Sequence, residues 1–209
     1  MRRVESVLSL AAAILLAATA GCTSQPAEAE AASPEEVAFV EYARRSLADA
    51  EARGASRSQI AALEAVVAVG SVSFETYRTS VEATLACFDE VGIAYTSREA
   101  EDGSGVPVIE YSFSGPASDS AVADGCISAN SEIVETLYMI QPSTQRLRDA
   151  SFEKRMDVLI PCLVEEGFVA ETEASDISVS EAQEALLTMI NSGTSDPYRC
   201  ATLAGIESF

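Results

Sequence analysis

Apolar residues in the first part of the chain recur every three or four positions, which is the period of an amphipathic helix. One such run begins at Pro34 and ends at Gly54. A second run begins near Ser56 and stops at Gly70. Proline near the start and glycine at the end are both typical helix boundary signals. Because the connection between the runs is short, we predict a helical hairpin over residues 34–70.

The same period returns further along the chain and leads to a cysteine. The apolar residues of this third run lie on one face of a helix: Phe74, Tyr77, Val81, Leu85 and Phe88. Cys87 lies beside this stripe near its end, and Gly92 fits the left-handed residue that commonly stops a helix.

The pattern then changes to the alternation expected of strands. Ile93–Thr96 reads as a short strand, and Val106–Phe113 alternates apolar and polar residues. Because Arg98–Gly105 between them is polar and rich in glycine, we predict a β-hairpin with a long loop. A helix from about Ser118 to Ile140 should follow, with a possible interruption near Gly125.

Residues 152–168 repeat residues 77–93 when 75 is added to each position. Cys87 aligns with Cys162, and Gly92 aligns with Gly167. The apolar stripe keeps its register, so the pattern indicates an internal repeat. Two differences stand out: Pro161 should kink the second helix, and no hairpin pattern follows. We read Ser151 as the cap of a helix that starts at Phe152, and we place the half-repeats at residues 71–145 and 146–209.

Each half-repeat contains a second cysteine. Cys126 follows Cys87 by 39 positions, and Cys200 follows Cys162 by 38. Four cysteines allow three pairings. If the halves are structural duplicates, the bonds are Cys87–Cys126 and Cys162–Cys200. A redox or zinc site is disfavoured, because the chain has no CxxC motif and no histidine.

The first residues resemble an export signal. Arg2 and Arg3 precede an apolar run that is too short to span a bilayer. The ending Thr-Ala-Gly-Cys22 is similar to the lipobox of bacterial lipoproteins, in which the cysteine is lipidated. An ordinary secretory cleavage site also fits, and the protein is then secreted. We favour a signal peptide at 1–21 and lipidation of Cys22, because this leaves an even number of cysteines to pair. Residues 22–33 read as a flexible tether.

The charge balance limits the partners of the chain. The formal net charge is −20, and removing residues 1–21 takes away two arginines and one glutamate, which makes it −21. Nucleic-acid binding requires a basic surface and is therefore excluded. The expected partners are a membrane, held through lipidated Cys22, and an unidentified envelope protein or small ligand. No cofactor is predicted.

The absence of histidine removes the common nucleophilic triads and histidine-ligated zinc. Ser151-Phe-Glu-Lys154 matches an S-x-x-K motif, but its usual K-T-G partner needs a second lysine that the chain lacks. The segment Glu99–Ser104 lacks calcium-loop spacing and reads as an acidic hairpin tip. Carboxylates are numerous, but none is singled out as catalytic. We therefore name no catalytic, cofactor-binding or metal-ligating residue.

The segment from Gln59 to Gly92 resembles small actinobacterial exported lipoproteins of unknown function, through Gln59-Ile-Ala-Ala-Leu, Val69-Gly-Ser-Val-Ser-Phe and Cys87-Phe-Asp-Glu-Val-Gly. These proteins carry C-x4-G helices, each paired with a downstream cysteine. The resemblance covers residues 56–140 and, more loosely, 152–203. It implies an exported protein but transfers no functional residue.

We therefore expect a mainly helical α+β fold: a helical hairpin followed by two disulfide-stapled half-repeats, the first with a small β-hairpin. The expected function is that of a lipid-anchored extracytoplasmic protein on the outer face of the cell membrane. It would act as a non-enzymatic binding or accessory module at the cell envelope. The alternative is a cell-envelope hydrolase that uses carboxylates only. A groove lined by Tyr77, Tyr95, Tyr111 or Tyr138 without ionisable groups would favour binding, and a buried pair of carboxylates in a cleft would favour hydrolysis.

Overall fold

The structure is a computed structural model that describes residues 32–115 and 117–206. The predicted signal peptide (1–21), Cys22 and most of the predicted tether lie outside the described residues, and the interpretations of these segments stay predictions. Within the described ranges, no helix combines the length and the apolar character needed to cross a bilayer.

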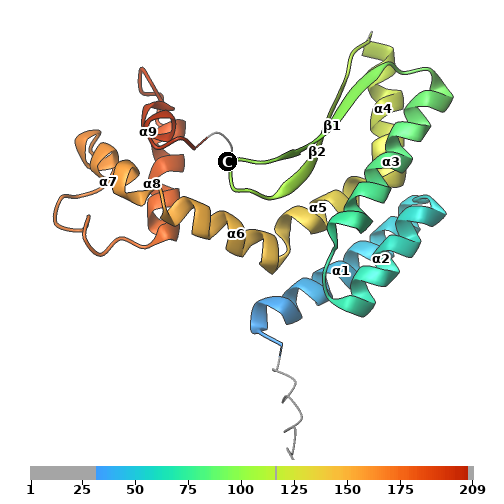
Figure 1. Cartoon of the computed structure of the whole chain (residues 1–209), viewed down its shortest axis with the longest axis horizontal. Helices are drawn as coiled ribbons and strands as arrows, with labels where there is room; N and C mark the ends of the chain where they lie inside the picture. Colours follow the sequence, from blue (N-terminus) through green and yellow to red (C-terminus); the bar gives the residue numbers. More distant parts are fainter. Residues whose placement is uncertain (1–31, 116, 207–209) are drawn as a thin grey trace, which may run out of the picture. The chain divides into compact units, whose positions relative to one another are not determined.

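Helices α1 (Pro34–Arg53) and α2 (Arg57–Val69) pack on each other as the predicted helical hairpin (Figure 1). The Ser33 hydroxyl accepts a hydrogen bond from the backbone N–H of Glu36, and the Glu36 carboxylate accepts one from the backbone N–H of Ser33. This capping box satisfies donors that the helix start leaves free. Gly54 has a φ of 74°, a left-handed value that glycine adopts without steric cost, and the chain turns there.

Helix α3 (Phe74–Val91) packs against α4 (Ala117–Asn130) and α5 (Glu132–Ile140). The predicted apolar stripe of α3 is buried from Tyr77 to Phe88. The expected interruption near Gly125 is wrong, because the break lies at Ser131. This serine is fully buried and non-helical, and its hydroxyl bonds to neighbouring side chains, so a polar contact determines the break.

Strands β1 (Tyr95–Glu101) and β2 (Pro107–Phe113) form an antiparallel hairpin in which Tyr95 pairs with Phe113 and Glu101 with Pro107. The predicted end of the first strand at Thr96 is wrong, because residues 97–101 also pair with β2. Their side chains are largely exposed, so no burial pattern marked them as a strand. The expected long loop shrinks to the five residues 102–106.

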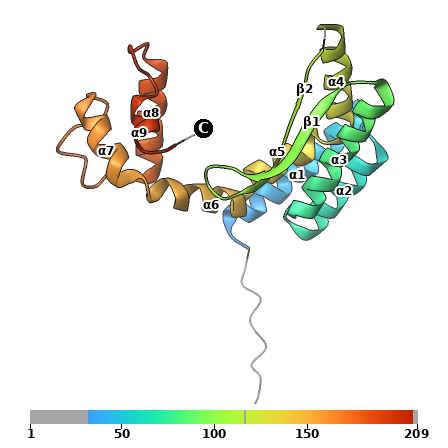
Figure 2. The same cartoon turned by 45° about the horizontal axis from the view of Figure 1, so that its top comes forward.

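The second half contains α6 (Pro142–Glu153), α7 (Met156–Glu165), α8 (Val179–Asn191) and α9 (Arg199–Leu203), all visible in Figure 2. Helix α6 runs across the boundary that was predicted between residues 145 and 146.

Two of the local predictions for this half need comment. Ser151 was predicted to cap a helix, and this prediction is wrong. The residue lies inside α6, near the end of that helix. The helical path breaks at residues 154–155, ahead of α7, whereas Pro161 lies inside α7. Pro161 is the sixth of the ten residues of α7, so its missing N–H removes one internal hydrogen bond, and α7 continues through it.

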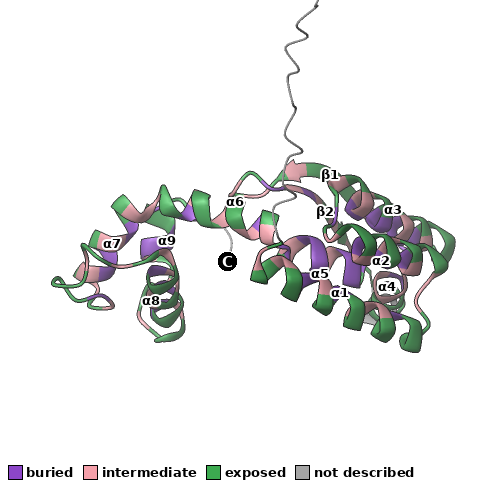
Figure 3. Cartoon of the chain, turned by 90° about the horizontal axis from the view of Figure 1, so that it is seen from below, coloured by how far each residue is buried: buried purple, intermediate pink, exposed green. Residues whose placement is uncertain are grey.

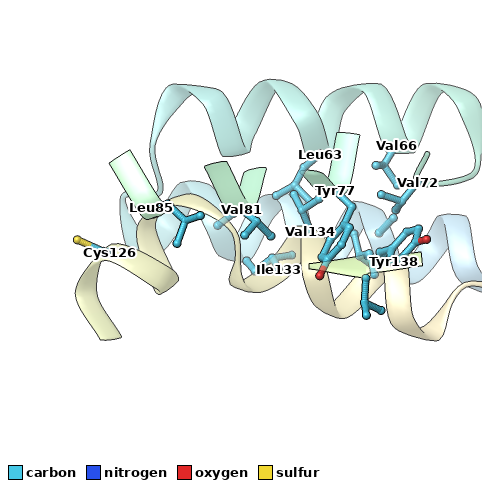
Figure 4. Close-up of a cluster of buried hydrophobic side chains, with 14 of the residues drawn as sticks. Leu63, Val66, Val72, Tyr77, Val81, Leu85, Cys126, Ile133, Val134 and Tyr138 are labelled. Carbon is cyan, nitrogen blue, oxygen red and sulfur yellow. The ribbon is translucent and has the colours of Figure 1, made fainter. Parts of the chain in front are cut away.

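The buried residues of the described ranges form two clusters. Figure 3 colours the buried residues purple along the ribbon. The first cluster is built by α1 to α5 and the hairpin, and includes Leu63, Val81, Phe88 and Leu137. Figure 4 shows Tyr77 and Tyr138 within this cluster. The second cluster is built by α6 to α9 and includes Leu159, Leu163, Leu186 and Met189. One disulfide joins α3 to α4 (Cys87–Cys126) and the other joins α7 to α9 (Cys162–Cys200).

The internal repeat extends to individual hydrogen bonds. At the end of α3, the N–H of Ile93 donates to the Phe88 carbonyl at 2.9 Å. At the end of α7, the N–H of Phe168 donates to the Leu163 carbonyl at 2.8 Å. Each donor and acceptor is displaced by the same 75 positions as the cysteines. The glycines between them, Gly92 and Gly167, have φ values of 78° and 79°.

The predicted fold class is therefore confirmed: the protein is mainly helical, with one two-stranded sheet among the described residues, and each half-repeat carries its own disulfide.

Candidate binding cleft

A cleft of about 640 Å³ is bounded by β2, α5, α6 and α8. This volume falls within the range of roughly 300–1,000 Å³ found for small-molecule sites. Its apolar lining consists of Val108, Ile109, Met139, Phe152, Leu187 and Ile206. Its charged lining consists of Asp102, Glu110, Glu135, Arg148, Asp149 and Arg155. The cleft therefore combines an apolar surface with both signs of charge.

Asp102 organises the turn of the β-hairpin at one end of the cleft. Its Oδ1 atom accepts hydrogen bonds from the backbone N–H groups of Ser104 (2.9 Å) and Val106 (3.0 Å). The turn is closed further by backbone bonds between Asp102 and Val106 and between Gly105 and Asp102. An aspartate that accepts from the backbone two residues ahead is a common turn device. Asp102 therefore has a structural role, and the hairpin tip is more ordered than its polar sequence suggested.

Helix α6 and the residue that precedes α7 hold this turn from the side. Arg148 donates to Oδ2 of Asp102 at 3.2 Å, in an ion pair whose carboxylate side chain is 14% exposed. Arg155 donates to the carbonyl of Gly103 at 2.6 Å. Arg148 and Arg155 are thus fixed against the hairpin turn, which gives one wall of the cleft a defined position.

Two tyrosines support the cleft from beneath β2. The rings of Tyr77 and Tyr138 stack with centroids 4.5 Å apart, and both side chains are buried. The Tyr77 hydroxyl accepts from the backbone N–H of Ile109 at 3.0 Å, and the Tyr138 hydroxyl donates to the Pro107 carbonyl at 3.0 Å. Burial raises the pKa of both phenols. The two hydroxyls thus satisfy backbone hydrogen-bonding groups at the edge of β2, and the stacked faces of the rings are closed to a ligand.

A chain of hydroxyl groups leads to Glu135 in the cleft wall. Thr84 donates to the Ser131 hydroxyl at 2.7 Å, and Ser131 in turn donates to Oε1 of Glu135. Tyr111 donates to the same oxygen at 3.2 Å. Burial, followed by the nearby Glu135 carboxylate, raises the pKa of Tyr111 above its usual range. Glu135 is thus oriented by two hydroxyl groups, those of Tyr111 and of Ser131, and Ser131 is itself held by Thr84.

The tyrosines named from the sequence are only partly brought together here. Tyr77 lines the cleft, whereas Tyr138 supports it from behind and Tyr111 lines a separate shallow hollow of about 310 Å³ on the hairpin. Tyr95 donates to Asp89 and lines neither. The cleft is therefore not the groove of tyrosines without ionisable groups that would have favoured binding, because charged residues dominate its polar lining.

Among the residues that the structure describes, no buried pair of carboxylates marks a hydrolytic site either. Asp102 is bonded to Arg148, and Glu110 is bonded to Arg98 on the facing strand. The four cysteines of the half-repeats are bonded in pairs and contribute no thiol. Across residues 32–115 and 117–206, no cluster of cysteine, aspartate or glutamate has the arrangement of a metal site.

Sequence reasoning missed Asp102, Glu135, Arg148 and Arg155 as cleft residues. Arg148 lies 46 positions from Asp102, Arg155 lies 52 positions from Gly103, and Tyr111 lies 24 positions from Glu135, and the sequence pattern gave no signal for these long-range contacts.

Comparison of the chain with known proteins found no matching protein family, no matching curated protein and no matching solved structure. The functional argument therefore depends on the cleft.

Proposed function

We propose that this protein is a lipid-anchored extracytoplasmic protein that acts as a non-enzymatic binding module at the cell envelope, with the cleft as its ligand site. The observation that carries the proposal is the lining of the cleft. It joins apolar side chains to charged groups held in place by Asp102, Ser131 and the hairpin turn. Fixed polar groups set in an apolar surface are typical of ligand sites.

The disulfides support the proposed location. Two bonds that each close a loop of nearly 40 residues are typical of oxidising compartments outside the cytosol. They use four of the five cysteines, and Cys22, directly after the predicted signal peptide, is the one left over. Lipidation gives this cysteine a chemical partner, and two acyl chains make a stable anchor.

Binding is favoured over hydrolysis because two of the four carboxylates at the cleft, Asp102 and Glu110, already form ion pairs with arginines. General acid catalysis by a carboxyl group needs an environment that favours its protonated form. Asp102 lies instead against Arg148, and Glu110 against Arg98 on the facing strand. The mature charge of −21 also disfavours long-range attraction of anionic wall polymers.

The experiment compares two leucines that are similarly exposed on helices. Leu187 on α8 is 46% exposed and lines the cleft, whereas Leu147 on α6 is 51% exposed and does not. The full protein and its Leu187→Trp and Leu147→Trp variants are purified without denaturation from envelope membranes and measured by native mass spectrometry.

We expect a bound small molecule on the wild type and on Leu147→Trp, and its loss in Leu187→Trp, because the larger ring fills the cleft. Equal retention by Leu187→Trp, or no bound molecule on any form, would contradict the proposal. Cleavage of isolated envelope fragments by the wild type would instead support the hydrolase alternative.

A further inference from the structure

Arg155 is a half-buried cation in the cleft without a carboxylate partner. Its guanidinium donates to the carbonyl of Gly103, a neutral group, and it forms no ion pair with any described residue. A guanidinium presents five donors in a fixed fork, and most remain free here. In a chain with a net charge of −20, an arginine left without a carboxylate at a cleft wall calls for an anionic partner.

Glu135, in the same cleft, is a carboxylate without a cationic partner. It is half-buried, and its Oε1 atom accepts from Ser131 and Tyr111, which are neutral donors. Its Oε2 atom accepts no hydrogen bond, and its carboxylate forms no ion pair, in the described part of the chain. An ionised carboxylate removed from bulk water gains from a positive partner, which the protein does not supply.

The other charges at the cleft are compensated or exposed. Asp102 is paired with Arg148, Glu110 is paired with Arg98, and Asp149 is exposed on α6. Arg155 and Glu135 do not pair with each other. The half-buried lining therefore offers one positive group and one negative group without a counter-charge, in a cleft that is also lined by apolar side chains.

These features discriminate between classes of ligand. A polyanion would meet Glu135 and Asp149, and a polycation would meet Arg155 and Arg148, so each would be repelled by part of the lining. A saccharide needs open aromatic faces, but the Tyr77 and Tyr138 rings are stacked and buried, and the chain has no tryptophan. A dipolar ligand with an apolar middle satisfies both charges and covers Met139, Phe152 and Leu187.

We propose that the cleft binds a short zwitterionic peptide, with the ligand carboxylate on Arg155, the ligand ammonium on Glu135, and apolar side chains on Met139 and Phe152. This assignment rests on the proposed binding function and specifies its ligand class. Carboxylate and guanidinium match as a two-point pair, which gives the ligand an orientation.

The test uses peptides that contain tryptophan, because the protein has none and the peptide fluorescence reports binding directly. The probe is leucyl-tryptophyl-alanine in four forms: free, N-acetylated, C-terminally amidated, and blocked at both ends. The full mature protein is titrated with each form. We expect the free peptide to bind tightest, with each single block weakening binding roughly tenfold, as for the loss of one charge-assisted hydrogen-bonded pair.

Two variants assign the two ends of the ligand. Arg155→Gln should bind the free acid and the amide equally, while it still discriminates against N-acetylation. Glu135→Gln keeps an acceptor for Ser131 and Tyr111, and it should show the reverse pattern. Arg155→Lys should restore part of the preference for the free acid. Arg57→Gln and Glu64→Gln, at exposed positions on α2, are the matched controls and should leave all four affinities unchanged.

A merely structural role of Arg155 and Glu135 would not produce these opposite preferences in the two variants, because a damaged fold would weaken the binding of all four peptides alike. Equal binding of the free and doubly blocked peptides, loss of the same preference in both variants, or no binding of any peptide would each overturn the assignment. The native mass spectrometry separates this failure from that of the proposed function. If Leu187→Trp loses the envelope ligand but the peptide titrations fail, the ligand class is wrong and the binding function still stands.

Discussion

The side-chain amide of Gln141 pairs with both backbone polar groups of Val72. Its Oε1 atom accepts from the Val72 N–H at 2.8 Å, and its Nε2 atom donates to the Val72 carbonyl at 3.0 Å. Both residues are buried, 69 positions apart. The amide thus imitates one rung of a β-ladder and joins the α2–α3 connection to the junction of α5 and α6. Without it, two buried backbone groups would have no partner.

Replacing Gln141 with leucine should lower the free energy of unfolding by about 3 kcal/mol, because a buried donor and a buried acceptor of Val72 lose their partner at about 1–3 kcal/mol each. Urea unfolding monitored by circular dichroism measures the change. Gln183→Leu, at a half-buried position on α8, is the control and should shift the midpoint little. An equal effect of the two substitutions would contradict the role given to the Gln141 amide.

Removing either disulfide should destabilise the protein by about 4 kcal/mol, because each bond closes a loop of 39 or 38 positions in the unfolded chain. The paired serine variants of each bond, measured by thermal unfolding, test this.

The two disulfides should also differ in their rate of reduction in the folded protein. Cys87 is half-buried, whereas Cys162 and Cys200 are both buried. A reducing thiolate must reach a sulfur atom, so the Cys87–Cys126 bond should open first. Timed alkylation followed by peptide mass mapping gives the order. Earlier labelling of Cys162 or Cys200 would show that exposure in the native fold does not control access.

Asp102→Ala should destabilise the protein more than Asp102→Asn. Asparagine keeps an oxygen for the N–H groups of Ser104 and Val106 and loses only the charge that faces Arg148, whereas alanine loses both. We expect a loss of about 2 kcal/mol for alanine and about half of that for asparagine, from the number of partly buried hydrogen bonds removed. Chemical denaturation of both variants provides the comparison, and equal losses would show that the turn bonds contribute little.

The capping box of α1 should make a pH-dependent contribution to stability. Hydrogen bonds from the backbone N–H and hydroxyl of Ser33 lower the pKa of Glu36 below its usual value of 4.5. A carboxyl whose pKa is lower in the folded state stabilises the fold above its unfolded pKa, and this contribution is lost as the pH falls through the folded value. Glu36→Gln should therefore cost stability at neutral pH, and this cost should disappear as the pH falls below 4.5 and through the folded-state pKa.

Urea midpoints of the wild type and Glu36→Gln across this pH range measure the difference. Glu64→Gln, at an exposed position on α2, controls for the change in net charge. A difference that stays constant with pH would show that the Glu36 charge has no part in the cap.

Cys22→Ala should release the protein from the membrane into the soluble extracytoplasmic fraction, because it removes the proposed site of lipidation. Intact-mass measurement of the membrane-bound wild type should show the added mass of the lipid, and non-reducing peptide mapping should show the other four cysteines as two disulfides. Membrane retention of the variant, or a wild-type mass without lipid, would contradict the proposed anchor.

Local sequence patterns were sufficient to predict where most of the helices lie. The period of apolar residues, the caps at Ser33 and Ser56, and the glycines at 54, 70 and 92 marked where α1, α2 and α3 begin or end, because these signals act within one turn of chain. The offset of 75 positions between the half-repeats favoured the disulfide pairing, since equivalent modules close equivalent bonds. Where an element depended on a distant partner, such as the break at Ser131 or the second half of β1, the local pattern was misleading.

The sequence by itself thus determined the helical character, the repeat and the pairing of the cysteines, all of which follow from spacing along the chain. Only the tertiary structure decided which side chains meet at the cleft. Arg155 beside Gly103, and Glu135 beside Tyr111, are brought together by packing of α5 and α6 on the hairpin. A charged residue has the same periodicity whether it is solvated or faces a cleft, so burial and partners, which belong to the folded chain, distinguish the two.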